Sequence, residues 1–355
     1  MPTATRKTTT AALRRAVVAA VTAVVLGSCP ALAAPAAGAG PNRAPAGPGP
    51  AEPVPTVFFG DSLAAGFGIA PVSPDGDGPF CFRAVANYPA VATRLLAERG
   101  VPLDVRADVS CSGAAVHDFW TPQPLAADRR AAPQQDALAP DTRLLVGSVG
   151  GNTLSFGRVL KQCSATLRAG SLMPGDPVDP DQPAADCREF FEEGAGREWL
   201  EGRFVQVEAE LTELLVRARL AAPGVRTVLV GYSRMVPADP AACLTPAPGQ
   251  DALPFADIPP DALPFIDRVQ RRLDDLTRRV AEAGGAAYVD LYDRTGDSTA
   301  CAGPDRGVGG LLEDSELGPD GRRIPWYVHP NERGRDLQAE QVAAAVEPLL
   351  GRAAR

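Results

Sequence analysis

A serine stands at the end of a short apolar run near residue 60. The stretch TVFFGDSL, residues 56–63, passes from apolar side chains into Gly60, Asp61 and Ser62. An apolar run of this length indicates a buried strand, and Gly and Asp are typical of turns. A serine held in such a turn can act as a nucleophile if a base removes its hydroxyl proton. Ser62 is therefore the first candidate for chemistry, and an ordinary turn at a strand end is the alternative.

A base for Ser62 has to come from one of two histidines, His117 and His329. His329 lies in WYVHPNERG, just before the last predicted helix, which is a common place for the base of an α/β hydrolase. Taken alone, a histidine followed by Pro330 is also typical of a plain loop. His117 lies beside Asp118 and aromatic residues, and this setting indicates a packed or hydrogen-bonded loop histidine. His117 is therefore not expected to have a catalytic role, and His329 is a candidate base with a plain loop residue as the alternative.

Attack on an ester carbonyl also requires donors for the oxygen on which negative charge develops. Gly113 can offer a backbone N–H without an obstructing Cβ. Asn152 follows the pair Gly150-Gly151 and can offer its side-chain amide. Each residue has an ordinary alternative, because glycine and asparagine at strand ends commonly form turns and caps.

The elements that must position these residues alternate between strands and helices. Strands are predicted at 56–60, 101–109, 142–152, 225–233 and 286–292, and helices at 88–100, 198–220, 262–283 and 331–349. This alternation predicts an α/β fold with three α/β/α layers and a central parallel sheet of about five strands. Ligands of such sheets bind beyond the carboxyl ends of the strands, where Ser62 and Asn152 are expected.

Four blocks in order resemble one family. They are FFGDSL at 58–63, Gly113, GGN at 150–152 and HPNERG at 329–334. This pattern resembles the GDSL esterases and lipases of the SGNH hydrolase superfamily, which have a flavodoxin-like fold, and the resemblance spans about residues 56–349. It implies that Ser62 is the nucleophile and His329 the general base. It also implies that the Ser62 and Gly113 N–H groups and the Asn152 side chain form the oxyanion hole.

Two positions depart from the family pattern. The family has Asp three residues before the histidine, where this chain has Trp326, and Thr153 replaces the Asp of GGND. The second change leaves Asn152 intact and is expected to matter little. For the first, some secreted bacterial relatives resemble Ser-His dyads in which the backbone carbonyl at this tryptophan position orients the histidine. We predict this role for the Trp326 carbonyl, with Asp290 or Asp293 as the alternative.

The cysteines indicate an oxidising compartment. Of seven cysteines, Cys29 lies in the N-terminal segment and the other six form an even set, which favours three disulfides. The spacing of the six does not choose among the possible pairings. The resemblance to the secreted branch implies that the pairs join sequence neighbours: Cys81–Cys111, Cys163–Cys187 and Cys243–Cys301.

The N-terminal part has the features of an export signal. Residues 1–33 combine basic residues, an apolar run and an ALA site, as in a secretory signal peptide. Lipidation at Cys29, which would anchor the protein at the cell surface, is the alternative. Residues 34–55 are rich in Ala, Pro and Gly and predict a linker, and 56–352 predict one hydrolase domain. We therefore expect a secreted, extracellular protein without stable membrane insertion.

The composition excludes some classes of partner. The net charge is −8 without a basic stripe, so nucleic-acid binding is not expected. The function predicted is hydrolysis of carboxylic esters, of the esterase or lipase type, through an acyl-serine intermediate. It needs a small-molecule or lipid ester and no metal or cofactor, and we expect a monomer. The alternatives are a carbohydrate deacetylase on the same fold and a catalytically silent surface or binding protein.

Overall fold

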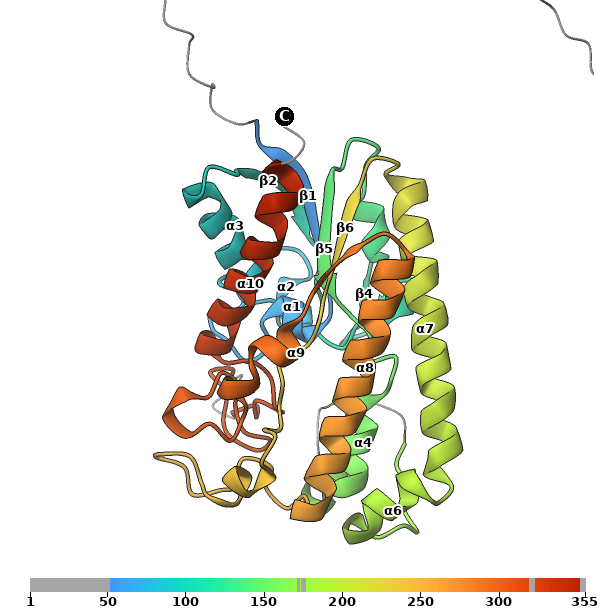
Figure 1. The fold of residues 1–355 in the computed structure, drawn as a ribbon, viewed down its shortest axis with the longest axis vertical. Helices are drawn as coiled ribbons and strands as arrows, with labels where there is room; N and C mark the ends of the chain where they lie inside the picture. Colours follow the sequence, from blue (N-terminus) through green and yellow to red (C-terminus); the bar gives the residue numbers. More distant parts are fainter. Residues whose placement is uncertain (1–51, 171–172, 174–176, 319–322, 352–355) are drawn as a thin grey trace, which may run out of the picture. The chain divides into compact units, whose positions relative to one another are not determined.

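The structure is a computed structural model that describes residues 52–170, 173, 177–318 and 323–351 (Figure 1). All of these residues belong to one compact unit, Pro48–Arg355. The predicted signal peptide at 1–33, Cys29 and nearly all of the predicted linker lie outside the described residues.

A five-stranded parallel sheet forms the centre of this unit. Its strands are β1 (Val54–Gly60), β2 (Leu103–Asp108), β5 (Leu144–Ser148), β6 (Arg226–Val230) and β7 (Ala287–Val289). Every neighbouring pair is parallel, and the order is β2-β1-β5-β6-β7. The central strand β5 is buried at every position, as expected for a parallel sheet covered on both faces.

Helices cover both faces of the sheet (Figure 1). Helices α7 (Gly196–Ala221) and α8 (Leu263–Ala283) share one core with Val57 and Phe59 of β1. Helices α3 (Tyr88–Glu98) and α10 (Glu332–Gly351) share a second core with Phe58. Successive side chains of a strand point to opposite faces, so β1 contributes to both cores. The predicted three-layer α/β/α fold is confirmed.

The apolar spacing of the sequence predicted the two long helices on the first face correctly. Phe204, Val207, Leu211, Leu214 and Leu215 are all buried on α7. On α8 the predicted apolar positions are likewise buried, and they are Leu263, Ile266, Val269, Leu273, Leu276 and Val280.

The predicted strand at 286–292 is too long. The strand β7 ends at Val289, and the short helix α9 (Leu291–Arg294) follows at once. The Asp290 side chain accepts a hydrogen bond from the Asp293 N–H and so caps this helix. Aspartate is a favoured helix N-cap because its side chain accepts a backbone N–H that has no partner within the helix. This cap ended the strand earlier than the apolar pattern indicated.

Shorter elements lie in the connections. The described short α-helices are α1 (Ser62–Ala65), α2 (Gly78–Cys81), α4 (Phe156–Cys163), α5 (Ala165–Gly170) and α6 (Cys187–Glu192). The described 3-10 helices are η1 (Val116–Phe119), η2 (Gln134–Ala137), η3 (Ala184–Asp186), η4 (Pro240–Leu244), η5 (Pro260–Ala262), η6 (Gly296–Ser298) and η7 (Gly303–Asp305). A two-stranded antiparallel hairpin is formed by β3 (Gln123–Pro124) and β4 (Arg130–Ala131).

Three disulfides join these connections to the rest of the fold. They are Cys81–Cys111, Cys163–Cys187 and Cys243–Cys301, the pairs that the resemblance implies. The second and third involve the two Pro-rich regions at about 171–188 and 236–262, part of the first of which lies outside the described residues. Disulfides restrict the unfolded chain and so stabilise segments that have little secondary structure.

Candidate active site

Ser62 and His329 meet at the carboxyl edge of the sheet. Ser62 begins α1 directly after β1, and His329 comes shortly before α10. The Ser62 Oγ and His329 Nε2 atoms are 2.7 Å apart, although 267 residues separate them in the sequence. The site lies beyond the carboxyl ends of β1 and β5. From β1 the sheet continues to β2 on one side, and from β5 it continues to β6 and β7 on the other side. This is the topological switch point where α/β sheets of this order bind ligands.

The residues before Ser62 build the turn that presents it. Gly60 has a φ of 133°, and a Cβ at this position would lie 2.3 Å from the Ser148 carbonyl oxygen. A residue with a side chain is therefore unfavourable at this position, because of the backbone conformation and because its Cβ would clash with Ser148. Asp61 caps α1, because its Oδ1 accepts a hydrogen bond from the Leu63 N–H at 3.0 Å. The Gly-Asp-Ser sequence is thus a close turn, a helix cap and a nucleophile candidate.

The Asp61 carboxyl also connects two loops of the site. Tyr232 Oη donates to Asp61 Oδ2 at 2.6 Å and accepts a hydrogen bond from the Gly151 N–H at 2.8 Å. Burial raises the pKa of Asp61 to about 7, against the hydrogen bonds from Tyr232 and Leu63, which lower it. Tyr232 was not predicted as a site residue. The one signal in the sequence was its place at the end of a predicted strand.

The His329 ring is held through its other nitrogen by backbone carbonyls. Nδ1 lies 2.8 Å from the Trp326 carbonyl oxygen and 3.0 Å from that of Tyr327. Tyr327 and Val328 have φ values of 49° and 56°, a left-handed conformation that is unfavourable for a β-branched residue such as Val. Backbone strain of this kind is concentrated at functional sites. Here it lies in the segment that brings both carbonyls to the ring.

Neither carboxylate that was considered as an alternative contacts His329 among the described residues. Asp290 Oδ2 pairs with Arg278 Nη2 at 2.9 Å, and Asp290 Oδ1 caps α9. Partial enclosure lowers the pKa of the His329 imidazole to about 4, because desolvation disfavours the charged ring and outweighs the two carbonyl contacts that raise the pKa.

This lowered pKa predicts where activity falls at acid pH. A base must be unprotonated, so kcat/KM should stay high down to about pH 5 and fall as the pH drops through about 4. Because the folded-state pKa lies below that of a free histidine, the free energy of unfolding should decrease earlier, as the pH falls from 6.5 to about 4. A pH–rate profile with a soluble ester tests this. An acid limb near 6.5, the ordinary histidine value, would contradict it.

The side chain and the carbonyl of Trp326 have separable roles. Its indole is buried between Gly68 and Gly309, where an added Cβ would lie 2.3 Å and 2.2 Å from the ring atoms. The carbonyl, in contrast, is present in any residue at this position. Removing the side chain therefore leaves a cavity without removing the contact to His329 Nδ1.

We expect Trp326→Phe to keep kcat within about threefold of the parent and Trp326→Ala to lower the free energy of unfolding by about 3–5 kcal/mol. The kcat of the Trp326→Ala molecules that remain folded should still be substantial. Steady-state kinetics and urea unfolding of both variants check this. A near-total loss of kcat in folded Trp326→Phe would show that the indole itself is required.

The expected oxyanion donors line the same cavity as Ser62. Gly113 has a φ of 83°, and its N–H has no hydrogen-bond acceptor within the described part of the chain. The Ser62 N–H, at the start of α1, is likewise without an acceptor among the described residues. Asn152 Nδ2 donates one hydrogen to the Ala114 carbonyl at 3.0 Å, which leaves its second hydrogen for another acceptor.

Thr153 has a defined structural part in this arrangement. Its Oγ1 accepts a hydrogen bond from the Val116 N–H at 2.8 Å and donates to Glu210 Oε2 of α7 at 3.0 Å. The hydroxyl thus joins the loop of Asn152 to the loop of Gly113. His117 is half exposed and also lines the cavity, with its Nε2 3.6 Å from Asp118 Oδ1 and its Nδ1 4.0 Å from Glu210 Oε2.

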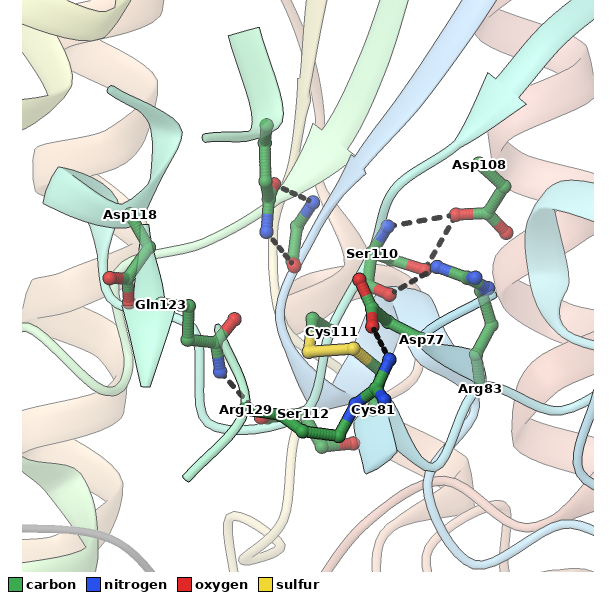
Figure 2. Close-up of a disulfide and its surroundings, with 12 residues drawn as sticks. Asp77, Cys81, Arg83, Asp108, Ser110, Cys111, Ser112, Asp118, Gln123 and Arg129 are labelled. Carbon is green, nitrogen blue, oxygen red and sulfur yellow. Dashed lines mark hydrogen bonds and ion pairs between the residues drawn. A yellow bond between two sulfur atoms is a disulfide. The ribbon is translucent and has the colours of Figure 1, made fainter. Parts of the chain in front are cut away.

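The disulfide Cys81–Cys111 lies beside Ser112, the residue before Gly113 (Figure 2). Near it, the Ser112 N–H donates to the Cys81 carbonyl at 3.0 Å, and Arg83 Nη1 donates to the Ser110 carbonyl at 3.0 Å. The segment that leads to Gly113 is therefore fixed by one covalent bond and by hydrogen bonds on both sides of Cys111.

A cavity of about 530 Å³ opens in front of Ser62 and His329. Gly113 and Asn152 also line it. Most of its wall is apolar, and the apolar side chains include Phe67, Phe80, Phe82, Leu125, Phe156, Leu160, Met235 and Leu273. This size and lining are typical of sites for small organic ligands.

Comparison with known proteins identifies the family of the chain. The GDSL-like lipase/acylhydrolase family matches residues 58–337. An esterase from Streptomyces scabiei is 58% identical over 354 residues, which cover 99% of this chain and 100% of that protein. Lipase 2 from Streptomyces coelicolor is 32% identical over 298 residues, which cover 82% of this chain and 86% of that protein.

Two solved structures share the fold. The extracellular lipase from Streptomyces rimosus has a TM-score of 0.53 at 18% identity and covers 82% of this chain and 99% of its own. Phospholipase A1 from Streptomyces albidoflavus has a TM-score of 0.51 at 19% identity and covers 84% of this chain and 98% of its own. The chain therefore belongs to the GDSL-like lipase/acylhydrolase family and is a carboxylic ester hydrolase of the esterase/lipase type.

Proposed function

We propose that the protein cleaves carboxylic esters through an acyl-enzyme formed on Ser62, with His329 as the general base. The observation that carries this proposal is the 2.7 Å contact between Ser62 Oγ and His329 Nε2. Nε2 takes the hydroxyl proton as Oγ attacks the ester carbonyl carbon. The imidazolium then returns the proton to the leaving alcohol as the ester C–O bond breaks. Water repeats the sequence on the acyl-serine and releases the acid.

The Trp326 and Tyr327 carbonyls have the role that a carboxylate has in a triad. Both accept the His329 Nδ1–H, so they keep the proton on Nδ1 and leave Nε2 free as the base. The low pKa of His329 keeps the ring neutral at ordinary pH and ready to accept the Ser62 proton. A neutral carbonyl stabilises the imidazolium less than a carboxylate does, so each turnover forms a more strongly acidic imidazolium.

The oxyanion of the tetrahedral intermediate is bound by three donors. They are the Ser62 N–H, the Gly113 N–H and Asn152 Nδ2, all of residues that line the cavity. The Ser62 and Gly113 N–H groups have no acceptor among the described residues, so both are available when negative charge develops.

The substrates of this site are esters with acyl chains longer than acetyl, as in lipids. The support is the largely apolar wall of the cavity, which would bury methylene groups. Burying one methylene contributes about 0.8 kcal/mol, or about a fourfold gain in kcat/KM.

An acyl-length series of p-nitrophenyl esters tests this proposal, with Ser62→Ala as the blank. We expect kcat/KM to rise about fourfold per methylene from acetate until the cavity is filled. A maximum at acetate with a steep fall afterwards would contradict the proposed preference and would favour a carbohydrate deacetylase.

We also propose that the protein acts outside the cell and as a monomer. Three disulfides support the location, since disulfides persist in oxidising compartments. Among the described residues, no helix has the length and apolar character needed to cross a bilayer. The residues proposed for the reaction all belong to this chain, so the proposed chemistry needs no residue from a second copy. Activity in the culture medium and the mass in solution test the two points.

A further inference from the structure

The peptide bond before Gly113 is held by a side chain from a separate hairpin. Gln123, the first residue of β3, donates from Nε2 to the Ser112 carbonyl oxygen at 2.9 Å (Figure 2). Gln123 is 6% exposed and, like Ser112 and Gly113, it lines the cavity in front of Ser62. Ser112 and Gly113 share one planar peptide unit. In a trans peptide the C=O and the N–H point in opposite directions, so fixing the carbonyl also fixes the direction of the Gly113 N–H.

The turn that contains this peptide has two possible orientations. The Ala114 N–H donates to the Cys111 carbonyl at 3.0 Å, which closes a four-residue turn with Gly113 in its third position. The φ of 83° at Gly113 identifies the type II form. Type I and type II turns differ by a reversal of the central peptide, here Ser112–Gly113. A change to type I would turn the Gly113 N–H away from its present direction.

The other contacts of the turn do not determine this orientation. The disulfide Cys81–Cys111 holds the first residue of the turn, and the hydrogen bond from the Ser112 N–H to Cys81 holds the preceding peptide. Glycine in the third position is compatible with both forms of the turn. Among the described residues, the Gln123 amide is the donor to the Ser112 carbonyl.

Two observations indicate that the Gln123 amide is placed for this hydrogen bond. Its Oε1 is buried without a hydrogen-bond partner among the described residues, which costs free energy that an apolar side chain would not cost. The 3-10 helix η2, which follows the hairpin that carries Gln123, is anchored at the site. Gln134 exchanges two hydrogen bonds with the backbone of Gly60, at 2.8 Å and 2.9 Å, next to the Ser62 turn.

We propose that Gln123 is a positioning residue for ester hydrolysis, which holds the Ser112–Gly113 peptide in the orientation that directs the Gly113 N–H to the oxyanion. This inference rests on the proposed role of Gly113 as an oxyanion donor. Gln123 does not contact the substrate in this role and acts through the peptide that it orients.

The test compares Gln123→Met with Gln162→Met as a matched control. Gln162 is fully buried and also bonds to backbone, at Asp179, but it does not line the cavity. For Gln123→Met we expect kcat to fall by about 10- to 100-fold, less than for complete loss of a donor, with KM within about twofold. The melting temperature should change little, because the variant also removes the unpaired Oε1. Gln162→Met should lose stability and keep kcat.

A trifluoromethyl ketone supplies a readout that a purely structural role would not change. Ser62 Oγ adds to its carbonyl carbon, and the resulting oxyanion occupies the same hole. Its inhibition constant should rise for Gln123→Met in parallel with the fall in kcat. Gln123→Glu keeps the side-chain length but places an acceptor against the Ser112 carbonyl, so it should lose at least as much activity as Gln123→Met.

Several results would overturn the inference. Unchanged kcat in folded Gln123→Met would do so, as would a fall in kcat without a matching rise in the inhibition constant. If neither Gln123 variant folds, the residue is required for folding and not for orienting the donor. Full activity of Ser62→Ala would instead contradict the proposed function, so the two failures are distinguishable.

Discussion

Replacing Ser62 by Ala is expected to lower kcat/KM for a soluble ester by about 10⁴-fold or more, because no hydroxyl remains to form the acyl-enzyme. The fold should persist, since Ser62 begins a helix whose cap is Asp61. His329→Gln should cause a loss of similar size, because Ser62 Oγ would have no base 2.7 Å away. The two losses should not add in the double variant, because the hydroxyl and the imidazole act as one unit.

Steady-state kinetics and circular dichroism of the three variants check this result. Ser164→Ala is a suitable control, because Ser164 bonds to Asp257 and does not line the cavity. It should lose stability without losing kcat/KM. Additive losses in the double variant would show that Ser62 and His329 act in separate steps or at separate places.

Replacing Asn152 by Ala is expected to lower kcat by about 10²- to 10³-fold with little change in KM. The Asn152 amide is expected to bind the oxyanion more strongly than the ground-state carbonyl, so its loss raises the barrier of the chemical step. Part of the loss comes from the bond to the Ala114 carbonyl, which steadies the Gly113 loop.

Asn152→Asp tests the effect of charge at this position, because it keeps the shape of the side chain while it removes both donated hydrogen bonds. It replaces the donor by a carboxylate that repels the oxyanion, so kcat should fall further than in Asn152→Ala. Kinetics of both variants with one short-chain ester measure the effect. A change in KM alone, with kcat preserved, would assign Asn152 to substrate binding and contradict its place in the oxyanion hole.

The sequence predicted the fold and the site correctly where a local pattern of residues also determines their position in space. Parallel strands end at one edge of a sheet, so residues that follow strand ends meet there, as Ser62 and Asn152 do. The apolar spacing of α7 and α8 predicted the helices because each has one buried face. Resemblance to a family, rather than spacing, singled out His329 among two histidines, suggested the Trp326 carbonyl and chose the cysteine pairs.

The contacts that support the site could not be predicted in this way. Tyr232 forms hydrogen bonds with Asp61 and Gly151, which are far away in the sequence, and Gln123 forms one with Ser112 in another loop. No periodicity or short motif encodes such a bond, since it depends on how turns and hairpins pack. Thr153 was expected to matter little, yet its hydroxyl bridges the loops of Gly113 and Asn152. The end of β7 was missed because the cap at Asp290 interrupts an apolar run.

Labelling with a fluorophosphonate, followed by mass spectrometry of the modified peptide, tests most directly whether Ser62 and His329 form the catalytic pair. The reagent reacts with a serine whose proton is removed by a neighbouring base. The account predicts one modified peptide, with the label on Ser62, and strongly reduced labelling in His329→Gln. Labelling of a different serine, or equal labelling of Ser62 without His329, would contradict it.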